Sequence, residues 1–362
     1  LLELAVPLVE SFKSAIGERR QRRALLVEWH DRDGAWGIGE CSCRPDPYFN
    51  GEYLDGAIEV VQKFIFPQFP AHGRLNEFTA VLGRVRNWPF TVSAVLDAML
   101  DLLRRKGAKD AIDCWQASKT DHIPVGLSLG LFGTTEQAVA RVQQAVEEGY
   151  RRIKLKVSPQ MELQPLFAIR EAFPNLPIAF DANGSGTEND LPFFVKLSKF
   201  APQMLEQPFA PSRFDLCCVL KKHAPGLRIC LDESVASYGD LLAAHNLQAL
   251  DELNLKPGRV GGQFEAVRLL EFCHAYGIPA WVGGMFETGI GRRANLRFAA
   301  RLPLAKAHDL SPSQRYFERD IVKPPIEMSA DGEIDCSDDK PVALDEEVIE
   351  SLLVRKIELV KR

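Results

Sequence analysis

The chain has 362 residues, 46% of them apolar and 26% charged, which suits a globular protein with room for one large domain and a smaller one. Its net charge of −5 gives no electrostatic reason to expect a nucleic acid or an anionic membrane as a partner. No apolar run in it approaches the ~20 residues that a membrane-spanning helix needs.

The predicted elements begin with an α+β module over residues 1–118. Apolar runs at 1–9 and 23–42 indicate strands, and the turn sequence Asp-Arg-Asp-Gly at 31–34 divides the second run into a hairpin. Helical patterns follow at residues 53–65, 75–86 and 90–107. The chain opens LLELAVPLVE, without an initiator Met or a signal pattern, so we expect that a few residues precede it.

From about residue 123, apolar strands alternate with amphipathic helices. The eight strand candidates are residues 123–129, 151–157, 177–182, 203–208, 228–233, 252–257, 278–285 and 305–310. Strands that are apolar on both faces suit a parallel sheet covered on both sides. An open doubly wound sheet is the alternative, but no glycine-rich dinucleotide or phosphate motif follows the first strand.

We therefore predict an α/β fold: a (β/α)7β TIM-like barrel over residues 119–320 with the N-terminal α+β module as a capping domain. The tail, residues 321–362, is acidic and then helical, and we expect it to pack back on the capping domain and complete it.

The eight cysteines form no C-x-x-C pair, and the seven histidines show no zinc-like spacing beside them. We expect free, buried or half-buried thiols in a reducing cytoplasm, in preference to a catalytic cysteine.

Charged residues end consecutive strands of the predicted barrel at intervals of about 25 residues. They are Lys154 and Lys156, Asp181, Glu206, Asp232 and Lys256. A strand of ~5 residues, a helix of ~11 and short loops occupy about this length, so one strand–helix unit repeats. In a barrel of parallel strands these ends lie on one face, where the loops build the active site.

The three carboxylates of Asp181, Glu206 and Asp232 come from consecutive strands and can converge near the barrel axis. An all-oxygen site suits Mg²⁺, and Mn²⁺ would accept the same geometry. Alternatively, each acid caps the next helix or joins a salt bridge. Their equal spacing at the ends of apolar runs favours the metal site.

Lys154 and Lys156 alternate along one strand, so their side chains point to the same face, which is the inside of the barrel if the strand lines it. A lysine in a barrel must be paired, and neighbouring cations lower the pKa of a lysine, which makes a workable general base. The alternative is two solvated lysines on an edge strand. Lys256 approaches from the opposite side as a second lysine or a carboxylate partner, and Arg259 can hold a negative substrate or lower a lysine pKa.

The loop GGMFETGIGR, residues 283–292, follows the seventh strand. Its first glycines allow close backbone approach, and the amides of Gly289 and Gly291 lie at a helix N-terminus that can bind an anion. Ser128 ends the first strand, where it donates to a substrate carboxylate or caps a helix. The candidate substrate contacts are Ser128, Asn183, Gly284, Met285 and Glu287. The loops at residues 14–17 and 47–53 are candidate lids, and the second is rich in aromatic and turn residues.

Several motifs, in their order and spacing, resemble those of the enolase superfamily, and most closely its o-succinylbenzoate synthase / N-succinylamino acid racemase branch. They are K-x-K, D-x-N, E-Q-P, D-E-S, N-x-K-P-G-R-V-G-G and G-G-M-x-E-T-G-I-G-R. The likeness covers nearly the whole chain, because VPLVESFKSAIG and GIGECSCRPDPYFNGEY look like that branch's capping domain, whose loops close over the site.

The resemblance implies a role for each matching residue. Asp181, Glu206 and Asp232 would bind Mg²⁺, Lys156 would abstract a proton and Lys256 would be the opposing lysine. Lys154 and Asn183 would support the carboxylate and metal shell. One departure is Gly184-Ser185-Gly186, where the family usually has an aromatic residue shortly after D-A-N. That change concerns substrate fit, since it lies outside the metal set.

The resemblance also implies an enzyme that acts on a small-molecule carboxylate, a cytoplasmic carbon–oxygen lyase that we expect to be a homo-oligomer. An o-succinylbenzoate synthase dehydrates 2-succinyl-6-hydroxy-2,4-cyclohexadiene-1-carboxylate for menaquinone biosynthesis. Lys156 would take the proton α to the carboxylate, and the metal and lysine would neutralise the developing ene-diolate. Hydroxide would then leave, while Lys256 stays cationic beside the ring.

Three alternatives remain. N-succinylamino acid racemase activity, alone or in addition, would use the two lysines from opposite faces, one removing and the other returning the proton. Dipeptide epimerase or muconate cycloisomerase activity shares the lysine pair but fits GGMFETGIGR less well. A metal-stabilised binding protein without turnover has no need of lysines on both sides of the metal.

Overall fold

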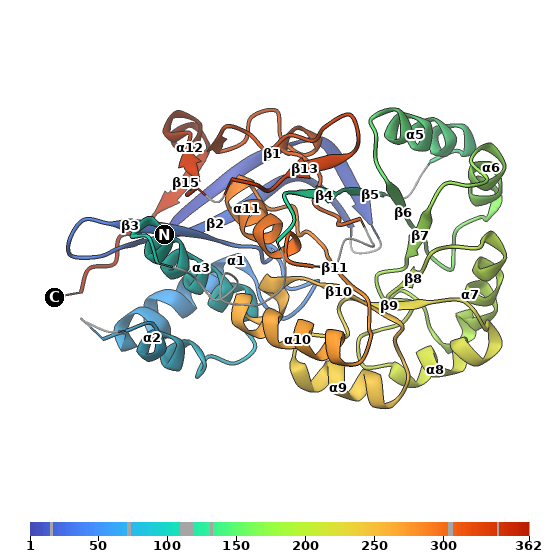
Figure 1. Ribbon diagram of the computed structural model, residues 1–362, viewed down its shortest axis with the longest axis horizontal. Helices are drawn as coiled ribbons and strands as arrows, with labels where there is room; N and C mark the ends of the chain where they lie inside the picture. Colours follow the sequence, from blue (N-terminus) through green and yellow to red (C-terminus); the bar gives the residue numbers. More distant parts are fainter. Residues whose placement is uncertain are drawn as a thin grey trace.

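The computed structural model describes residues 1–14, 17–70, 74–108, 119–130, 133–302, 307–338 and 340–361. Two parts lie side by side, an antiparallel sheet with its helices and a curled parallel sheet with an outer layer of helices (Figure 1). The predicted fold class, a (β/α)7β barrel with an α+β cap that includes the C-terminal tail, is confirmed.

The capping part is a four-stranded antiparallel sheet in the order β15-β1-β2-β3. Its strands are β1 (Leu2–Ser14), β2 (Gly17–His30), β3 (Trp36–Cys41) and β15 (Leu353–Lys356). The predicted turn between β2 and β3 is present: the Asp31 side chain accepts hydrogen bonds from the amides of Asp33 and Ala35, and Gly34 has φ +82°. This local bonding is the reason that Asp and Gly favour such a turn.

Helices cover one face of this sheet. They are α1 (Leu54–Val60), which continues as a π-helical turn (Val61–Ile65), α2 (Leu75–Leu82) and α3 (Pro89–Arg105). The backbone of α3 lies so close to β3 that a Cβ at Gly37 or Gly39 would clash with it. The glycines of the W-G-I-G-E strand therefore set the distance between helix and sheet.

The barrel is a seven-stranded parallel sheet whose strands follow one another in chain order. They are β5 (Gly126–Leu129), β6 (Arg152–Lys156), β7 (Ile178–Asp181), β8 (Leu205–Glu206), β9 (Ile229–Leu231), β10 (Glu252–Leu255) and β11 (Ala280–Val282). Residues 303–306 lie outside the described part, but the rest of the predicted eighth strand closes the ring. His308 forms a parallel bridge with Val125, and Asp309 forms one with Gly283.

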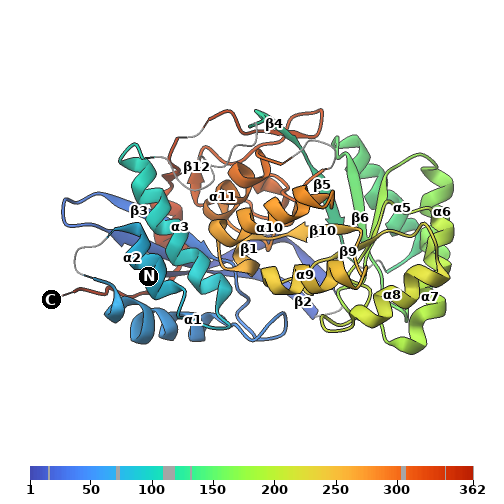
Figure 2. The ribbon, with the colours of Figure 1, turned by 60° about the horizontal axis from the view of Figure 1, so that its bottom comes forward.

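One helix follows each strand of this sheet, and Figures 1 and 2 show these helices around its outer face. They are α5 (Thr135–Glu147), α6 (Gln164–Ala172), α7 (Leu191–Leu197), α8 (Phe214–His223), α9 (Tyr238–Asn246), α10 (Gln263–Ala275) and α11 (Gly289–Ala299). The predicted alternation of apolar strands with helices is therefore present.

Side chains fill the inside of the barrel in layers, as in other eight-stranded barrels. Ala179, Met204, Cys230 and Trp281 form a small buried apolar cluster. Two residues further along the same strands come Asp181, Glu206, Asp232 and Gly283. Because side chains alternate along a strand, these residues form the next layer on the same face. An apolar layer therefore supports the charged one.

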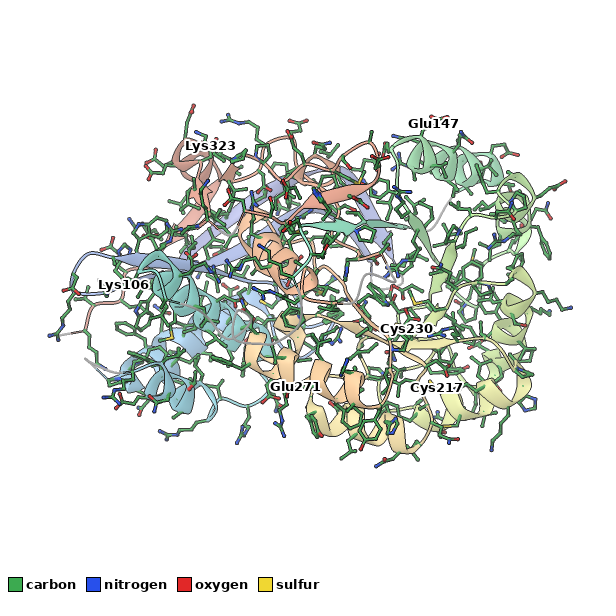
Figure 3. The ribbon with its side chains drawn as sticks, viewed as in Figure 1. Lys106, Glu147, Cys217, Cys230, Glu271 and Lys323 are labelled. Atoms are coloured by element: carbon green, nitrogen blue, oxygen red, sulfur yellow. The ribbon has the colours of Figure 1, made fainter. Side chains whose placement is uncertain are left out.

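The described cysteines are free thiols, as predicted, and each of them except the half-buried Cys218 is buried. Figure 3 labels Cys217 on α8 and Cys230 on β9. Burial raises the pKa of the Cys217 thiol to about 12. Cys114 lies outside the described residues. The described part of the chain contains no helix with the length and apolar character needed to span a bilayer.

The C-terminal tail returns to the capping sheet. Its elements are β12 (Val322–Lys323), β13 (Glu333–Asp335), β14 (Ala343–Leu344), α12 (Glu346–Leu352) and β15. β13 pairs with β4 (His122–Pro124), which directly precedes the first barrel strand, and β15 pairs antiparallel with β1. The domain bounds 1–118, 119–320 and 321–362 stay a prediction, and residues 109–118 lie outside the described part.

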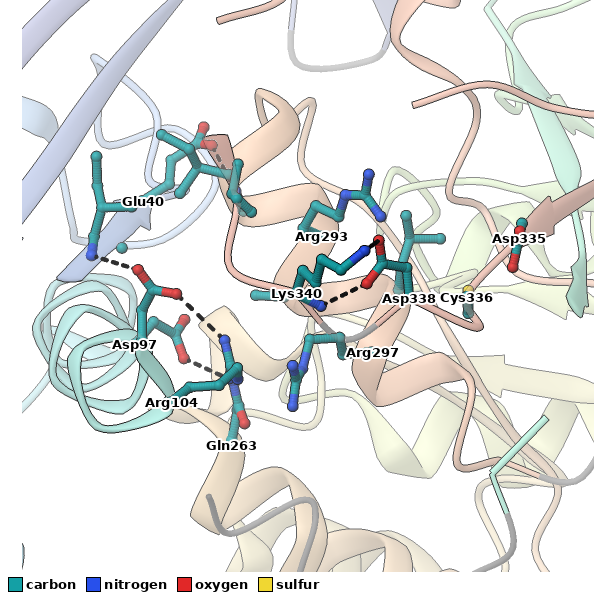
Figure 4. A pocket seen from close by; sticks show the side chains of 18 residues that line it. Glu40, Asp97, Arg104, Gln263, Arg293, Arg297, Asp335, Cys336, Asp338 and Lys340 are labelled. Carbon is teal, nitrogen blue, oxygen red and sulfur yellow. Dashed lines mark hydrogen bonds and ion pairs between the residues drawn. The ribbon is translucent and has the colours of Figure 1, made fainter. Parts of the chain in front are cut away.

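The two parts meet along a charged seam between β3, α3, α10 and α11 (Figure 4). Glu40 of β3 accepts hydrogen bonds from the Thr288 amide (3.1 Å), the Thr288 hydroxyl (2.6 Å) and the Gly291 amide (3.1 Å). Gln263 at the start of α10 donates to Asp97 of α3 (3.0 Å). A carboxylate of the cap thus binds the N-terminus of a barrel helix, which favours negative charge.

Candidate active site

The strand register places the predicted charges side by side. Lys156 is directly opposite Asp181 on the neighbouring strand, and Asp181 is opposite Glu206 on the next. Asp232 and Lys256 each come one residue after the end of their strands. The equal spacing in the sequence therefore corresponds to one rim of the barrel.

A pocket opens at this rim. Its lining includes most of the predicted site residues, namely Ser128, Lys154, Lys156, Asp181, Asn183, Asp232, Lys256, Gly284 and Met285. Phe49, Asn254, Gly283 and Phe286 also line it, and they lie in segments that the sequence analysis marked without naming them as site residues. Arg44, Asp309 and Tyr316 are further lining residues that the sequence analysis did not propose for the site. The lining thus draws on both the barrel and the cap.

Lys156 is held by two oxygen acceptors. Its Nζ lies 2.6 Å from Asp181 Oδ2 and 2.6 Å from Asn183 Oδ1. Asn183 has φ +45°, a left-handed conformation that asparagine tolerates, and its amide nitrogen Nδ2 donates to Glu233 Oε1 (3.2 Å). Because Glu233 takes the NH₂ group, the Asn183 oxygen faces Lys156. The D-A-N motif thus provides one anion and one neutral acceptor for the same lysine.

Lys154 is surrounded by carboxylates. Its Nζ lies 2.7 Å from Asp309 Oδ2, 2.8 Å from Glu206 Oε2 and 3.5 Å from Asp181 Oδ2. Burial alone would lower the pKa of Lys154, but the negative charges of Asp309, Glu206 and Asp181 outweigh it and raise this pKa well above its usual value. Lys154 is consequently a fixed cation, a state suited to binding negative charge and unsuited to taking a proton.

Lys256 and Arg259 share one partner on the other side of the pocket. Lys256 Nζ donates to Asp232 Oδ2 (2.7 Å), and the Arg259 guanidinium binds the other oxygen of Asp232. Burial opposes ionisation of Asp232, but the charges of Lys256 and Arg259 prevail and lower its pKa to about 2. Arg259 also donates to two backbone carbonyls, so its role here is to hold the end of β10 and not to face a substrate.

Glu206 is fully buried between Lys154 and Asn254, whose amide donates to Oε1 (2.7 Å). Burial, followed by the negative charge of Asp181, raises the pKa of Glu206 to about 8. Burial and the repulsion between neighbouring carboxylates thus both oppose the ionised form of Glu206. A bound divalent cation would relieve this repulsion.

The donor set fits a hard divalent cation in chemistry, since Asp181, Glu206 and Asp232 offer carboxylate oxygens from adjacent strands. In the arrangement described here, no three His, Cys, Asp or Glu side chains of the described residues converge closely enough to hold an ion. The lysine ammonium groups lie against the oxygens that a cation would take. Binding of a metal would thus require those contacts to lengthen.

In the loop after β11, the polar groups form hydrogen bonds to one another and to neighbouring carboxylates. Glu287 is buried, and its carboxylate accepts from the Met285 amide (2.8 Å) and from Asn295 (3.0 Å), so it shapes the loop. The amides of Gly289 and Gly291 bind Asp320 and Glu40. The helix N-terminus that was expected to bind an anion thus binds carboxylates of the chain itself. A Cβ at Gly283 would clash with Asn254, which explains the glycine.

Ser128 lies on β5 opposite Lys154. Its hydroxyl is buried and has no hydrogen-bond partner within the described ranges. A buried hydroxyl without a partner is costly, so a substrate group that bonds to it would be favoured. This geometry suits the predicted contact with substrate, which stays a prediction.

Asp309, which the sequence analysis missed, completes the rim from the eighth strand. Its Oδ1 accepts from Arg152 (2.8 Å), and its Oδ2 pairs with Lys154. Burial disfavours its ionised form, but the charges of Lys154 and Arg152 hold its pKa well below the usual range. The signal was present in the sequence, because Asp309 ends an apolar strand just as Asp181 and Asp232 do.

The cap contributes its loop between β3 and α1. Phe49 lies in the pocket with its ring 5.5 Å from Lys256 Nζ and packs against Phe90, whereas Tyr48 is 71% exposed. At the end of this loop, Glu52 accepts from the amides of Phe90 and Thr91 at the start of α3. Residues 15 and 16 of the other predicted lid lie outside the described part of the chain.

Comparisons with known proteins agree with this arrangement. Residues 137–341 match the family model of enolase C-terminal domain-like proteins. The o-succinylbenzoate synthase of Listeria innocua is 32% identical over 331 residues, which cover 91% of this chain and 88% of the relative. The N-succinylamino acid racemase of an Amycolatopsis species is 34% identical over 333 residues, covering 90% and 88%.

Solved structures extend the comparison to the whole chain. An enolase superfamily member from Listeria innocua superimposes with a TM-score of 0.89 at 30% identity, covering 98% of this chain and 96% of that one. A muconate lactonizing enzyme from Pseudomonas fluorescens gives a TM-score of 0.90 at 22% identity, covering 98% and 97%. The second likeness concerns the fold alone.

Proposed function

The chain belongs to the enolase superfamily, in its o-succinylbenzoate synthase / N-succinylamino acid racemase branch, and on this premise we propose that the enzyme is an o-succinylbenzoate synthase of menaquinone biosynthesis. It would remove water from 2-succinyl-6-hydroxy-2,4-cyclohexadiene-1-carboxylate. The observation that carries the proposal is a pair of lysines, Lys156 and Lys256, on opposite sides of a buried carboxylate cluster.

In this proposal Lys156 Nζ takes the proton α to the ring carboxylate. Its support is positional: Asp181 and Asn183 fix the amine at the rim from two directions, so the amine needs little reorganisation to meet the substrate. Lys154 cannot share this role, because Asp309 and Glu206 hold it as a cation. The two lysines of K-x-K thus have different tasks, one as base and one as fixed positive charge.

Lys256 would stay protonated beside the ring while hydroxide leaves from the same intermediate. Its Nζ pairs with Asp232, and the aromatic ring of Phe49 lies on the side of the cap. The positive charge of Lys256 would stabilise negative charge that develops on the substrate, in a site that the cap would shield from water.

Asp181, Glu206 and Asp232 would hold Mg²⁺, with Mn²⁺ as a substitute. When bound, the cation supplies positive charge at the carboxylate whose α-proton is removed. Burial and the nearby charge of Asp181, which together raise the pKa of Glu206 to about 8, support this assignment, since such a group is expected where a cation normally compensates the charge.

Racemisation of N-succinylamino acids is the second candidate, alone or as an additional activity. The opposed lysines favour it directly, since one face of the substrate would meet Lys156 and the other would meet Lys256. A relative named N-succinylamino acid racemase is as similar to this chain as those named o-succinylbenzoate synthase.

An assay of the purified protein with both substrates and Mg²⁺ tests the proposal. We expect conversion of the cyclohexadiene carboxylate to o-succinylbenzoate, measured as the appearance of this aromatic product. Polarimetry on one enantiomer of an N-succinylamino acid measures the alternative. The Lys156→Ala protein, purified in the same way, is the control for contaminating activity.

The outcomes separate the candidates. Dehydration that is lost in the Lys156→Ala control supports the synthase. Racemisation without dehydration assigns the alternative. Absence of both activities in the metal-loaded enzyme overturns both proposals.

A further inference from the structure

Arg44 is a cation that the cap contributes to the active-site pocket. It follows β3 by three residues and lies in the pocket lining with Lys256, Phe49 and Met285. Only 6% of its surface is exposed. Arginine is seldom buried to this extent without a specific partner, so its surroundings indicate what it binds.

The pairing of Arg44 differs from that of the three lysines in the pocket. Each lysine contacts a carboxylate that is itself almost fully buried in the barrel. Arg44 instead donates from Nε (2.5 Å) and Nη2 (2.9 Å) to Asp46, two residues along the same loop, whose side chain is 30% exposed. Water screens the charge of Asp46 more than it screens that of a buried acid.

One edge of the guanidinium therefore remains for another acceptor. Asp46 takes the edge formed by Nε and Nη2, and Arg44 Nη1 has no hydrogen-bond partner among the residues that the structure describes. Arginine carries five N–H donors in a planar arrangement that matches a carboxylate. Asp46 thus orients Arg44 without saturating it.

We propose that Arg44 binds the carboxylate at the end of the substrate's succinyl group and so selects dicarboxylate substrates. This inference rests on the proposed function, in which the synthase and racemase substrates both carry two carboxylates. One lies at the carbon that loses its proton, beside the lysines and the metal ligands. The other is four carbons along the succinyl chain and needs its own partner when the cap buries it.

The remaining residues of the pocket lining suit the part of the substrate that lies between its two carboxylates. Phe49 and Phe286, together with Met285, offer apolar surface for the methylene groups of a succinyl chain. The pocket thus has charged groups for the reacting end, apolar walls for the spacer and one further cation on the side of the cap.

Binding of matched ligands tests the proposal without turnover. Calorimetry in Mg²⁺ compares o-succinylbenzoate with 2-butanoylbenzoate, which has the same chain length but lacks the terminal carboxylate. A charge-assisted hydrogen bond of ordinary strength corresponds to a ~10–100-fold difference in affinity. We expect wild type to prefer o-succinylbenzoate by about this factor. Arg44→Met should lose that preference while binding 2-butanoylbenzoate within about threefold of wild type.

Two further variants separate recognition from a merely structural role. Arg44→Lys keeps the charge without the planar donors and should retain part of the preference. Asp46→Asn removes the loop partner but keeps Arg44, so it should retain the preference for the dicarboxylate. If Arg44→Met and Arg44→Lys weaken both ligands equally, Arg44 only holds the loop and the proposal is overturned. A preference that survives in both variants also overturns it.

A second ligand pair distinguishes failure of this inference from failure of the synthase assignment. N-succinyl and N-butanoyl derivatives of one amino acid differ by the same carboxylate. If wild type binds only this pair, and Arg44→Met removes its preference for the succinyl form, the inference holds and the enzyme is the racemase. If wild type binds neither pair, the proposed function fails and the inference fails with it.

Discussion

The barrel rim and the capping loop place charges in the active-site pocket by different means. On the rim, each charged side chain is at a strand end and has a buried partner of opposite sign, as Lys156 has Asp181 and Lys256 has Asp232. On the cap, Arg44 lies in a loop and pairs with a partly exposed neighbour. The charges of the rim thus compensate one another in the barrel interior, whereas the loop presents a cation whose partner is partly exposed.

This difference indicates a division of labour. Strand register fixes the distances between reacting groups, which chemistry at one carbon requires. A loop can change its residues without disturbing that register, which suits a role in choosing the substrate. The same difference predicts how substitutions act. A rim substitution leaves a buried partner unpaired and costs stability as well as activity, whereas a cap substitution changes substrate preference.

Among changes at the rim, removal of metal should have the largest effect on activity. We expect a chelator to abolish turnover and Mg²⁺ or Mn²⁺ to restore it. Added Mg²⁺ should also raise the melting temperature of wild type, because a ligand that binds only the folded state stabilises it. Glu206→Gln should remain folded but show weak metal binding by calorimetry and little rise in melting temperature.

The capping loop provides the matched control for this experiment. Asp46→Asn changes an acid near the pocket but away from the three carboxylates, so its metal affinity should equal that of wild type. Full activity in excess chelator would contradict the metal assignment.

Lys156→Ala tests the assignment of the base. It should lower kcat by at least the ~10²–10⁴-fold typical of general base catalysis. Lys256→Arg keeps a cation of different shape and should leave measurable dehydration in a synthase. In a racemase both lysines must exchange protons, so either substitution should stop interconversion of the enantiomers.

Exchange in D₂O sharpens this prediction. The Lys256→Arg variant should still exchange the α-proton of the enantiomer that faces Lys156. Exchange of both enantiomers in that variant would show that the two lysines do not serve opposite faces.

The same two regions show what the sequence could predict. The rim residues Asp181, Glu206 and Asp232 could be located because a repeated strand–helix unit converts spacing along the chain into position around a ring. Asp309 carries the same signal, but β11 ends in glycines, and the interrupted series hid it. The cap has no such repeat, so nothing in the sequence connected Arg44 with a lysine more than 200 residues away.

The sequence also could not show which hydrogen-bond donors and acceptors pair with one another. Glu287 is in a motif of the family, yet its carboxylate bonds to the Met285 amide within the same loop. The amides of Gly289 and Gly291 were expected to bind an anion, and the anions prove to be Asp320 and Glu40 of the chain itself. Glu40 comes from a different part of the fold, and only the assembled structure shows which of several acids reaches a given helix N-terminus.

Deletion of residues 46–51 tests the role of the cap as a lid. The loop carries Phe49 into the pocket but contributes the exposed Tyr48 on its outer side, so we expect a large loss of activity and a small change in melting temperature. Glu52, whose carboxylate binds the start of α3, stays in this variant and keeps the loop end anchored. Unchanged activity after the deletion would contradict the lid role. A large fall in melting temperature that accompanies the loss of activity would show a structural role for the loop instead.

The smallest effect is expected at the seam between the two regions, where Glu40 binds the N-terminus of α11. Burial raises the pKa of Glu40 from 4.5 to about 7, although the charge of Arg22 opposes the shift, while the nearby Glu287 adds to it. A carboxyl group whose pKa is raised on folding stabilises the fold below its unfolded pKa. That contribution is lost as the pH rises through the folded value. It should therefore decline between about pH 4.5 and pH 7, by up to ~3 kcal/mol for a shift of this size.

Glu40→Gln removes this titration and should flatten the dependence of the unfolding free energy on pH over that range. Gln offers a single amide oxygen where the Glu40 carboxyl group uses both of its oxygens to accept from Thr288 and Gly291 at the start of α11, which costs ~1 kcal/mol. It should consequently be less stable than wild type at pH 5 and approach or exceed it at pH 8, as measured by urea denaturation at each pH. Glu171→Gln, an exposed change on α6, should keep the wild-type profile. If Glu40→Gln also keeps the wild-type profile, Glu40 does not titrate over this pH range. The contact between the cap and the barrel then does not depend on the protonation of Glu40.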